Sequence, residues 1–196
     1  MQEPVSNIHN RVVDGDEDAE LMRAIAAGDE KAFQQLLRRH LAAAVRLAAR
    51  VLGGNAAAED IAQQAFLRVW QHAGNFEDPA KKGARFSTWL YRIVVNLCID
   101  EKRKRQFDNI DDIPDLVDPE PDAEKALRQK EQARRVRDAL QELPERQRTA
   151  FVLCFYEGYS NKEAADMLGI GLKAIESLLV RARKHLREKL QEEKAS

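Results

Sequence analysis

Residues 86–105 combine side chains that can bind nucleic acid. The aromatic rings of Phe86 and Trp89 are followed by the hydrogen-bond donors Arg92 and Asn96, and the stretch ends in four consecutive cations. Cations neutralise phosphates, aromatic rings stack on unpaired bases, and guanidinium and amide groups bond to base edges. The stretch therefore indicates a nucleic-acid-binding surface, although an ordinary core helix with a solvated basic end has the same pattern.

The spacing of the hydrophobic residues predicts that this stretch is an α-helix. They recur at the intervals of one helix face, namely at Phe86, Trp89, Leu90, Ile93, Val94 and Leu97. Thr88, Arg92 and Asn96 recur every four residues on another face. We expect the first face to pack into a core and the second to present its donors, with exposed aromatic rings completing the surface.

Residues 158–190 form a second candidate DNA-binding unit. Ser160 and Glu163 have the spacing of a capping box, and Gly169 and Gly171 flank a tight turn between a short helix and a longer basic one. This pattern is typical of a helix-turn-helix, although a plain helical hairpin has the same periodicity. The longer helix would bury Leu172, Ile175, Leu179, Ala182 and Leu186, and would present outward Lys173, Ala174, Glu176, Ser177, Arg181 and Lys184.

The composition predicts an all-α protein of one or two domains. The 196 residues are 44% hydrophobic and 33% charged, with few glycines and prolines. No apolar run approaches the ~20 residues of a membrane span, and we expect no signal peptide in the acidic N-terminus. Cys98 and Cys154 lie in separate apolar stretches, which favours small buried residues in a reducing, cytoplasmic compartment.

The remaining side chains give no sign of catalysis. The histidines are scattered, at His9, His40, His72 and His185, and we expect them at the surface or at its boundary. The sequence has no recognisable metal-ligand spacing, phosphate-binding loop or catalytic triad. We therefore do not expect an enzyme, and we expect no metal, cofactor or small-molecule substrate.

The distribution of charge divides the chain. The formal net charge is −1, but residues 20–106 sum to +6 and residues 125–196 to +5, and the residues 107–124 between them sum to −8. Two basic parts separated by an acidic one fit two nucleic-acid-binding modules. We predict a disordered N-terminus (1–18), a helical domain (19–106), a flexible acidic linker (107–124) and a second helical domain (125–192).

Three motifs in order resemble those of a bacterial sigma factor of the extracytoplasmic-function (ECF) group. They are AEDIAQQAFLRVW (58–70), FSTWLYRIVVNLCIDEKRK (86–104) and LPERQRTAFVLCFYEGYSNKEAADMLGIGLKAIESLLVRARKHL (143–186). The resemblance implies two small helical domains, sigma2-like and sigma4-like, the second being the helix-turn-helix. It also implies a factor that binds core RNA polymerase and promoter DNA and directs promoter-specific initiation.

The resemblance also implies which residues make these contacts. Those to the −10 promoter element fall on Asn75, Lys82, Arg85, Thr88, Trp89, Arg92, Asn96, Arg103 and Lys104, with the loop 74–84 holding a flipped base. Those to the −35 element fall on Ser160, Lys162, Lys173, Ala174, Glu176, Ser177, Arg181 and Lys184. Those to polymerase fall on Asp60, Gln63, Gln64, Arg68 and Trp70. An anti-sigma factor, in many cases membrane-bound, would hold the cytoplasmic chain inactive at the inner membrane.

The chain departs from the family pattern at a few positions. Gln64 stands where many members have Glu, and Glu176 and Leu178 stand where Lys and Arg are common. The usual −35 sequence therefore does not carry over, and Glu176 could instead accept a hydrogen bond from a cytosine amino group.

Two other functions stay open. A sigma-like decoy would bind regulators and not promoters, and it would lose the cations of both DNA-binding surfaces. The presence of Arg103, Lys104, Arg181 and Lys184 argues against it. A stand-alone helix-turn-helix regulator would leave residues 86–104 and the acidic linker without a role.

Overall fold

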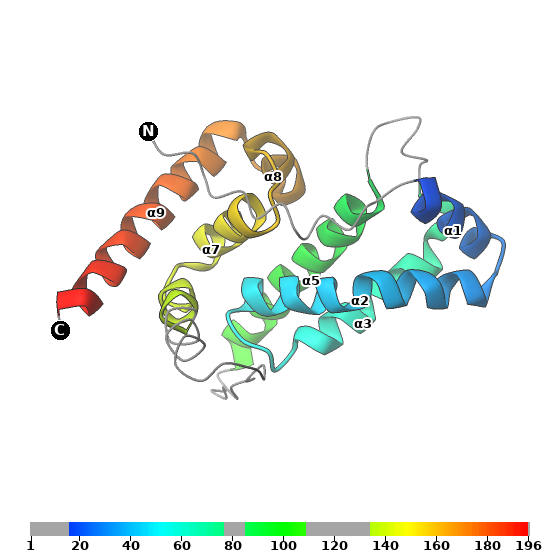
Figure 1. Ribbon diagram of the computed structural model, residues 1–196, viewed down its shortest axis with the longest axis horizontal. Coiled ribbons are helices and arrows are strands. Elements are labelled where there is room, and N and C mark those ends of the chain that lie inside the picture. The colour runs from blue at the N-terminus through cyan, green and yellow to red at the C-terminus, as the bar shows by residue number, and fades with distance from the viewer. Residues whose placement is uncertain (1–15, 77–84, 109–133, 196) are drawn as a thin grey trace, which may run out of the picture.

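The computed structural model describes residues 16–76, 85–108 and 134–195, and over these ranges every regular element is helical, which confirms the predicted all-α class. The helices lie in two groups (Figure 1). The first group contains α1 (Asp16–Ala26), α2 (Glu30–Leu52), α3 (Ala58–Gln71), the 3-10 helix η2 (Ala73–Asn75) and α5 (Phe86–Asp108). The second contains a helical stretch over residues 134–141, α7 (Glu145–Phe151), the π-helical η3 (Val152–Tyr156), α8 (Asn161–Leu168) and α9 (Leu172–Ala195). None of the helices described could span a membrane.

Helix α2 is the central helix of the first group, and Asp29 and Gly53 set its ends. The Asp29 carboxylate accepts hydrogen bonds from the backbone N–H groups of Lys31 (2.8 Å) and Ala32 (3.2 Å). At the other end Gly53 has φ +79° and donates its N–H to the carbonyl of Ala49 at 2.9 Å. Because this left-handed conformation is costly for a residue with a Cβ, glycine is the favoured residue at the end of α2.

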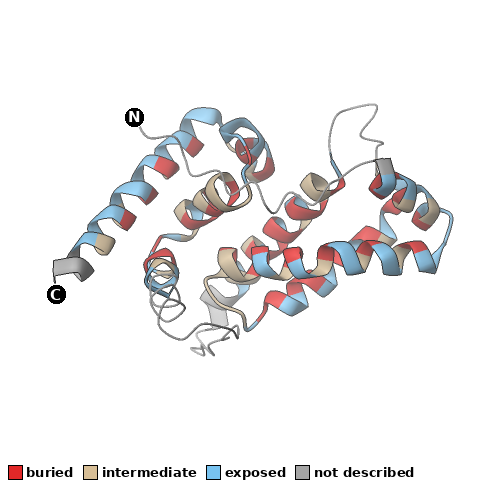
Figure 2. Ribbon diagram, in the orientation of Figure 1, coloured by how far each residue is buried: buried red, intermediate tan, exposed pale blue. Residues whose placement is uncertain are grey.

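Helices α1, α3 and α5 all pack against α2. Their buried residues line the sides that face one another (Figure 2). The expected inward side of residues 57–73 is confirmed, since Ile61, Ala65, Phe66 and Val69 are all buried. Helix α5 continues to Asp108, so the first two residues of the expected linker are helical, and the rest of that linker lies outside the described residues.

The start of α7 and both ends of α8 lie where the sequence predicts. Pro144 precedes the first residue of α7, and the Ser160 capping box is present, with the Ser160 N–H donating to Glu163 Oε2 at 2.8 Å. Gly169 ends α8 with φ +63°. Helix α9 then packs against both α7 and α8, which gives the predicted helix-turn-helix.

The prediction for the inward face of α9 is wrong at one residue, Leu172. Ile175, Leu179, Ala182 and Leu186 are buried, but Leu172 is 49% exposed. Leu172 is the first residue of the helix and lies at the edge of the hydrophobic stripe, so it precedes the turn at which packing begins.

The two groups pack directly against each other. Arg50 of α2 pairs with Glu157 at 3.0 Å, and the Glu157 side chain is only 5% exposed. Arg148 of α7 is buried and donates from Nη1 to the backbone carbonyl of Leu52 at 3.3 Å. One cluster of buried hydrophobic residues continues from the first group into the second. The sequence did not predict how the two groups are arranged. In the structure they are packed together, and we call this the closed arrangement.

Candidate nucleic-acid interface

Helix α5 has the two faces that its sequence predicts. Phe86, Leu90, Val94 and Leu97 are buried and anchor the helix on α2 and α3. The side away from this core bears Thr88, which is half-buried, and the exposed Arg92, Asn96 and Arg103. Trp89 is half-buried at the edge of the hydrophobic stripe, and Lys104 is exposed near the end of the helix.

The aromatic residues near the start of α5 form a cluster and do not stand free on the surface. Phe86 is 1% exposed, as expected of its place on the core-facing stripe, and it fills the space between α2 and η2. Its centroid lies 5.9 Å from that of Phe76 and 6.1 Å from that of Trp89, and the Phe76 and Trp89 rings lie 5.4 Å apart. The half-buried rings of Phe76 and Trp89 are therefore the ones that can meet a base.

The predicted base-holding loop falls largely outside the described residues. Of the residues expected there, Asn75 in η2 and Arg85 before α5 are exposed. Lys82 lies outside the described ranges.

The outer face of the helix-turn-helix is open to solvent. All the candidate −35 residues are exposed: Ser160, Lys162, Lys173, Ala174, Glu176, Ser177, Arg181 and Lys184. Two of the hydroxyls already have partners within the fold. The Ser160 hydroxyl donates to Glu163 Oε2 at 2.7 Å, and the Ser177 hydroxyl donates to the Lys173 carbonyl at 2.9 Å. The charged side chains of α9 and the small Ala174 are thus the more direct candidates for base contacts.

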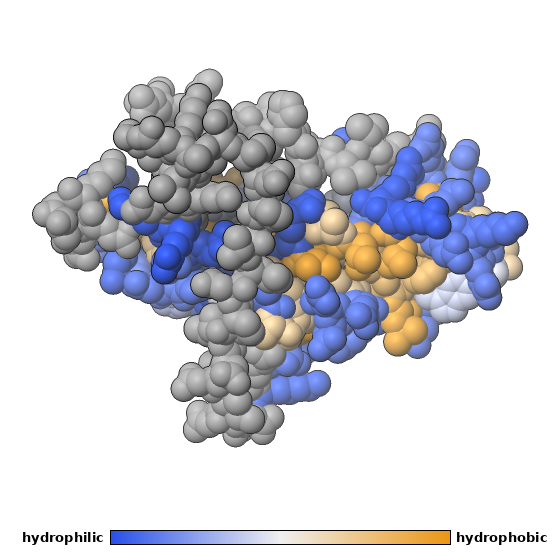
Figure 3. Space-filling model, turned by 60° about the horizontal axis from the view of Figure 1, so that its bottom comes forward, coloured by the Kyte–Doolittle hydropathy of each residue, from blue (hydrophilic) through white to orange (hydrophobic). Residues whose placement is uncertain are grey.

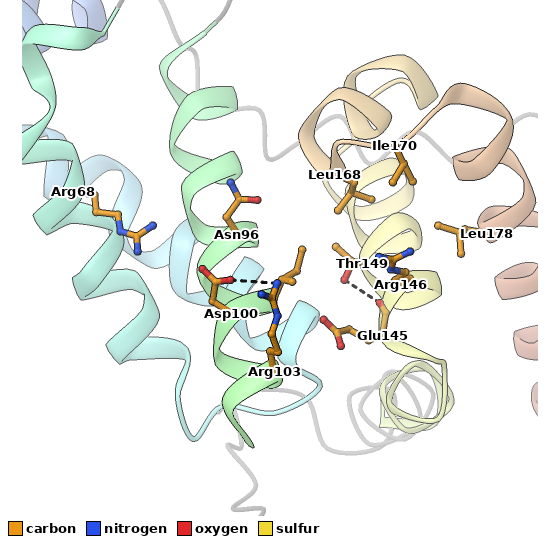
Figure 4. A pocket seen from close by; sticks show the side chains of 11 residues that line it. Arg68, Asn96, Asp100, Arg103, Glu145, Arg146, Thr149, Leu168, Ile170 and Leu178 are labelled. Carbon is orange, nitrogen blue, oxygen red and sulfur yellow. Dashed lines mark hydrogen bonds and ion pairs between the residues drawn. The ribbon is translucent and has the colours of Figure 1, made fainter. Parts of the chain in front are cut away.

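A cavity of about 620 Å³ separates α5 from the helix-turn-helix. Figure 4 shows a polar wall from α3 and α5, with Arg68, Asn96 and Arg103, which is paired with Asp100 at 3.7 Å. The facing wall comes from the second group and includes Glu145, Arg146, Thr149, Leu168, Ile170 and Leu178. Asn96 and Arg103 therefore face the inner side of the helix-turn-helix while the groups are packed together.

Helix α3 presents the residues expected to bind polymerase. Asp60, Gln63, Gln64 and Arg68 are exposed, and Trp70 is half-buried with its ring 5.2 Å from that of Phe33. Leu67, which the sequence analysis did not single out, is 56% exposed among them. Figure 3 shows the molecule turned so that the bottom of Figure 1 comes forward. In the right half of this view, hydrophobic residues occupy one area that is bordered by hydrophilic ones.

Three buried polar groups were not found from the sequence. His40 is fully buried, so the expectation that the histidines lie at the surface or its boundary is wrong there. Its Nε2 lies 2.9 Å from the carboxylate of Asp18, which is itself 1% exposed. The third is Arg148. Each lies at a helical position that periodicity assigns to a buried face, but periodicity does not identify the partner.

Neither cysteine has the environment of a reactive thiol. Burial raises the pKa of Cys98 to about 12 and that of Cys154 to about 11. Both are therefore protonated thiols at neutral pH, and the thiolate is the form that reacts. Among the described residues, no group of three or more His, Cys, Asp or Glu side chains could hold a metal ion.

The fold and these surfaces define a helical DNA-binding protein with a helix-turn-helix and a second basic, aromatic helix. Residues 36–107 match the family model of Sigma-70 region 2, and residues 133–186 match that of Sigma-70 region 4. Over 169 residues the chain is 38% identical to the ECF RNA polymerase sigma factor SigM of Mycobacterium tuberculosis, which covers 86% of this chain and 82% of SigM.

Other comparisons agree with this match. The chain is 31% identical to the ECF RNA polymerase sigma factor SigW of Bacillus subtilis, over 87% of this chain and 95% of SigW. The solved structure of the sigma factor RpoE of Bartonella quintana, in complex with the anti-sigma factor NepR, superposes with a TM-score of 0.66. That likeness has 27% identity and covers 82% of this chain and 98% of RpoE. The chain belongs to the ECF sigma factors.

Proposed function

We propose that this chain binds core RNA polymerase and directs it to promoters, and that it performs no covalent chemistry of its own. The observation that carries the proposal is the pairing, in one chain, of an exposed helix-turn-helix with the polar outer face of α5. The two family models match these two parts in the same order along the chain. A stand-alone helix-turn-helix regulator would not need the second surface.

We assign opening of the −10 element to the outer face of α5 and the cluster of Phe76 and Trp89. Stacking of one base on an aromatic ring contributes about 1–3 kcal/mol, and each base-pair step lost on opening costs about 1.4 kcal/mol. Capture of one or two unpaired bases thus offsets much of the cost of opening a short stretch. Arg92 and Asn96 would bond to the captured bases or their phosphates, and Arg103 and Lys104 would neutralise the backbone.

We assign the −35 element to the first turns of α9. A recognition helix places its N-terminal residues against base edges in the major groove, which here are Lys173, Ala174, Glu176 and Ser177. The Glu176 carboxylate is acceptor-only and therefore favours the amino group of cytosine. Arg181 lies further along the helix, where the phosphate backbone is the nearer partner.

We assign polymerase binding to α3. Its exposed Asp60, Gln63, Gln64 and Arg68 surround Leu67, and an apolar side chain within a polar rim is the usual composition of a protein interface. By analogy with RpoE, which was solved with NepR, we also propose that an anti-sigma factor controls this chain in the cytoplasm.

The test separates the two activities. We expect the double substitution Arg92→Ala and Asn96→Ala to abolish open-complex formation, measured by permanganate reactivity of unpaired thymines, while core polymerase binding stays within twofold of wild type. Arg23→Ala, an exposed arginine of α1 outside every candidate site, is the control. Equal loss of both activities would contradict the assignment of α5.

The promoter itself can be found with the same proteins. Core polymerase and this chain would be mixed with fragmented genomic DNA from the source, and transcript starts sequenced. Starts that share two upstream elements at fixed spacing would support a promoter-specificity factor. Polymerase binding without initiation would favour the decoy, and DNA binding without polymerase binding would favour the stand-alone regulator.

A further inference from the structure

A cluster of polar and charged side chains, of which Asp18 and His40 are buried, joins α1 to α2. Asp18 of α1 accepts a hydrogen bond at Oδ1 from Arg39 Nη1 (2.8 Å), and its Oδ2 lies 2.9 Å from His40 Nε2. Arg39 also pairs with Glu17, whose side chain is 72% exposed. A carboxylate that is buried without partners is strongly unfavourable, so these contacts define one position of α1 on α2.

His40 connects this cluster to the aromatic residues near the start of α5. Its buried ring meets that of Phe86 edge-on, with 4.9 Å between centroids and 63° between planes. Phe86 in turn contacts Phe76 and Trp89. A continuous row of contacts therefore runs from Asp18 to the two rings that can meet a base. In a close-packed interior, displacement of one member of such a row displaces the next.

Helix α1 reaches the same region by a second route. It packs directly against η2, which carries Asn75 and ends immediately before Phe76. Helix α1 nevertheless lies outside residues 36–107, the part of the chain that matches the region 2 family model. Two independent contacts thus connect α1, which lies outside that match, to the aromatic cluster.

We propose that Asp18 and His40 are positioning residues for promoter opening, which hold Phe76 and Trp89 in the orientation that captures an unpaired base. The inference rests on the −10 role proposed above for α5. Neither residue touches DNA, since both are buried. Their contribution is preorganisation, because a ring that is already fixed loses little conformational freedom when a base stacks on it.

The test uses two buried substitutions and one matched control. Asp18→Asn keeps the shape of the side chain and removes its charge, and His40→Gln keeps an N–H donor near Asp18 but removes the ring that contacts Phe86. Glu17→Gln is the control, because Glu17 also pairs with Arg39 but its side chain is 72% exposed, whereas that of Asp18 is buried against His40. The probe is a single-stranded oligonucleotide with the −10 sequence of a promoter mapped as described above.

We expect Asp18→Asn and His40→Gln each to weaken binding of the oligonucleotide by the polymerase holoenzyme about tenfold, or 1.4 kcal/mol. Assembly with core polymerase and binding of the upstream duplex should change less than twofold, and Glu17→Gln should behave as wild type. Wild-type oligonucleotide binding by both variants would overturn the inference. So would a parallel loss of core polymerase binding, which would indicate general disruption of the first group.

A spectroscopic measurement separates positioning from simple stabilisation. In a Trp70→Phe background Trp89 is the only tryptophan, and its emission reports its surroundings in the folded chain without DNA. We expect both buried substitutions to change this emission and its quenching by iodide. A lower unfolding temperature with unchanged emission would overturn the inference.

Trp89→Ala distinguishes failure of the proposed −10 surface from failure of the positioning role alone. If it leaves oligonucleotide binding unchanged, the proposed −10 surface itself is wrong. If it weakens binding while Asp18→Asn and His40→Gln do not, the −10 surface stands and only the positioning role fails.

Discussion

Substitution of Gly53 tests one of the contacts that join the two helical groups, that of Arg148 with the Leu52 carbonyl. Gly53 has φ +79°, and a Cβ at this position would lie 1.8 Å from Arg148 Nη1. A non-glycine residue in the left-handed region costs roughly 1–2 kcal/mol. The guanidinium lies at the end of a flexible side chain, so it would move aside and lose its 3.3 Å hydrogen bond to the Leu52 carbonyl. A hydrogen bond from a charged donor contributes about 1.5–3 kcal/mol. We therefore expect Gly53→Ala to lower the free energy of unfolding by about 2.5–5 kcal/mol.

Two other glycines separate the backbone effect from the contact. Gly28 has φ +90° with no atom within 4 Å of an added Cβ, so Gly28→Ala should cost only the backbone part, roughly 1–2 kcal/mol. Gly54 has neither feature, and Gly54→Ala should lie within about 0.5 kcal/mol of wild type. Urea unfolding followed by circular dichroism gives all three values. Small-angle X-ray scattering would detect separation of the groups in Gly53→Ala.

The reasoning would be refuted if Gly53→Ala cost no more than Gly28→Ala. The Arg148 contact would then contribute nothing to the closed arrangement. A double-mutant cycle makes the same point independently, because in an Arg148→Ala background the cost of Gly53→Ala should fall to that of Gly28→Ala.

Three further outcomes are expected. Arg181→Ala should weaken upstream duplex binding at every sequence and reduce the salt dependence by about one phosphate contact, measured by titration at several salt concentrations; an unchanged slope would remove Arg181 from the interface. Ser160→Ala should lower stability by about 1 kcal/mol in thermal unfolding through loss of the N-cap; a neutral result would show that solvent replaces the cap. Burial raises the pKa of Cys98 to about 12 and that of Cys154 to about 11, from an ordinary value of 9.0. Above pH 9 the folded chain therefore keeps protons that the unfolded chain releases, so stability should fall as pH rises from about 9. Alanine at both positions should flatten that part of the pH profile.

Local patterns predicted most of the helices because the signals for them lie close together in the sequence. The Asp29 cap, the Ser160 capping box and the hydrophobic stripe of α5 are each complete within a few residues, and each is present in the structure. The resemblance to a family then supplied the order of the two domains.

Tertiary pairs could not be predicted in this way. His40 falls on the buried stripe of α2, but nothing near it in the sequence indicates that Asp18, 22 residues earlier, compensates it. Arg50 and Glu157 are 107 residues apart. Such pairs depend on how whole helices pack against one another. The same cause explains Leu172, whose type suits the core but whose place at the start of α9 leaves it exposed.

The partners of Arg148 have a consequence for how the closed arrangement tolerates mutation. The guanidinium binds two backbone carbonyls, those of Leu52 and Leu143 at 3.3 and 3.2 Å. Every amino acid offers that carbonyl, so the hydrogen bonds do not depend on which side chains occupy positions 52 and 143. They require only an arginine at position 148 and the absence of a side chain at position 53. In a saturation library scored for compactness, position 53 should therefore accept far fewer substitutions than the neighbouring, half-buried position 52.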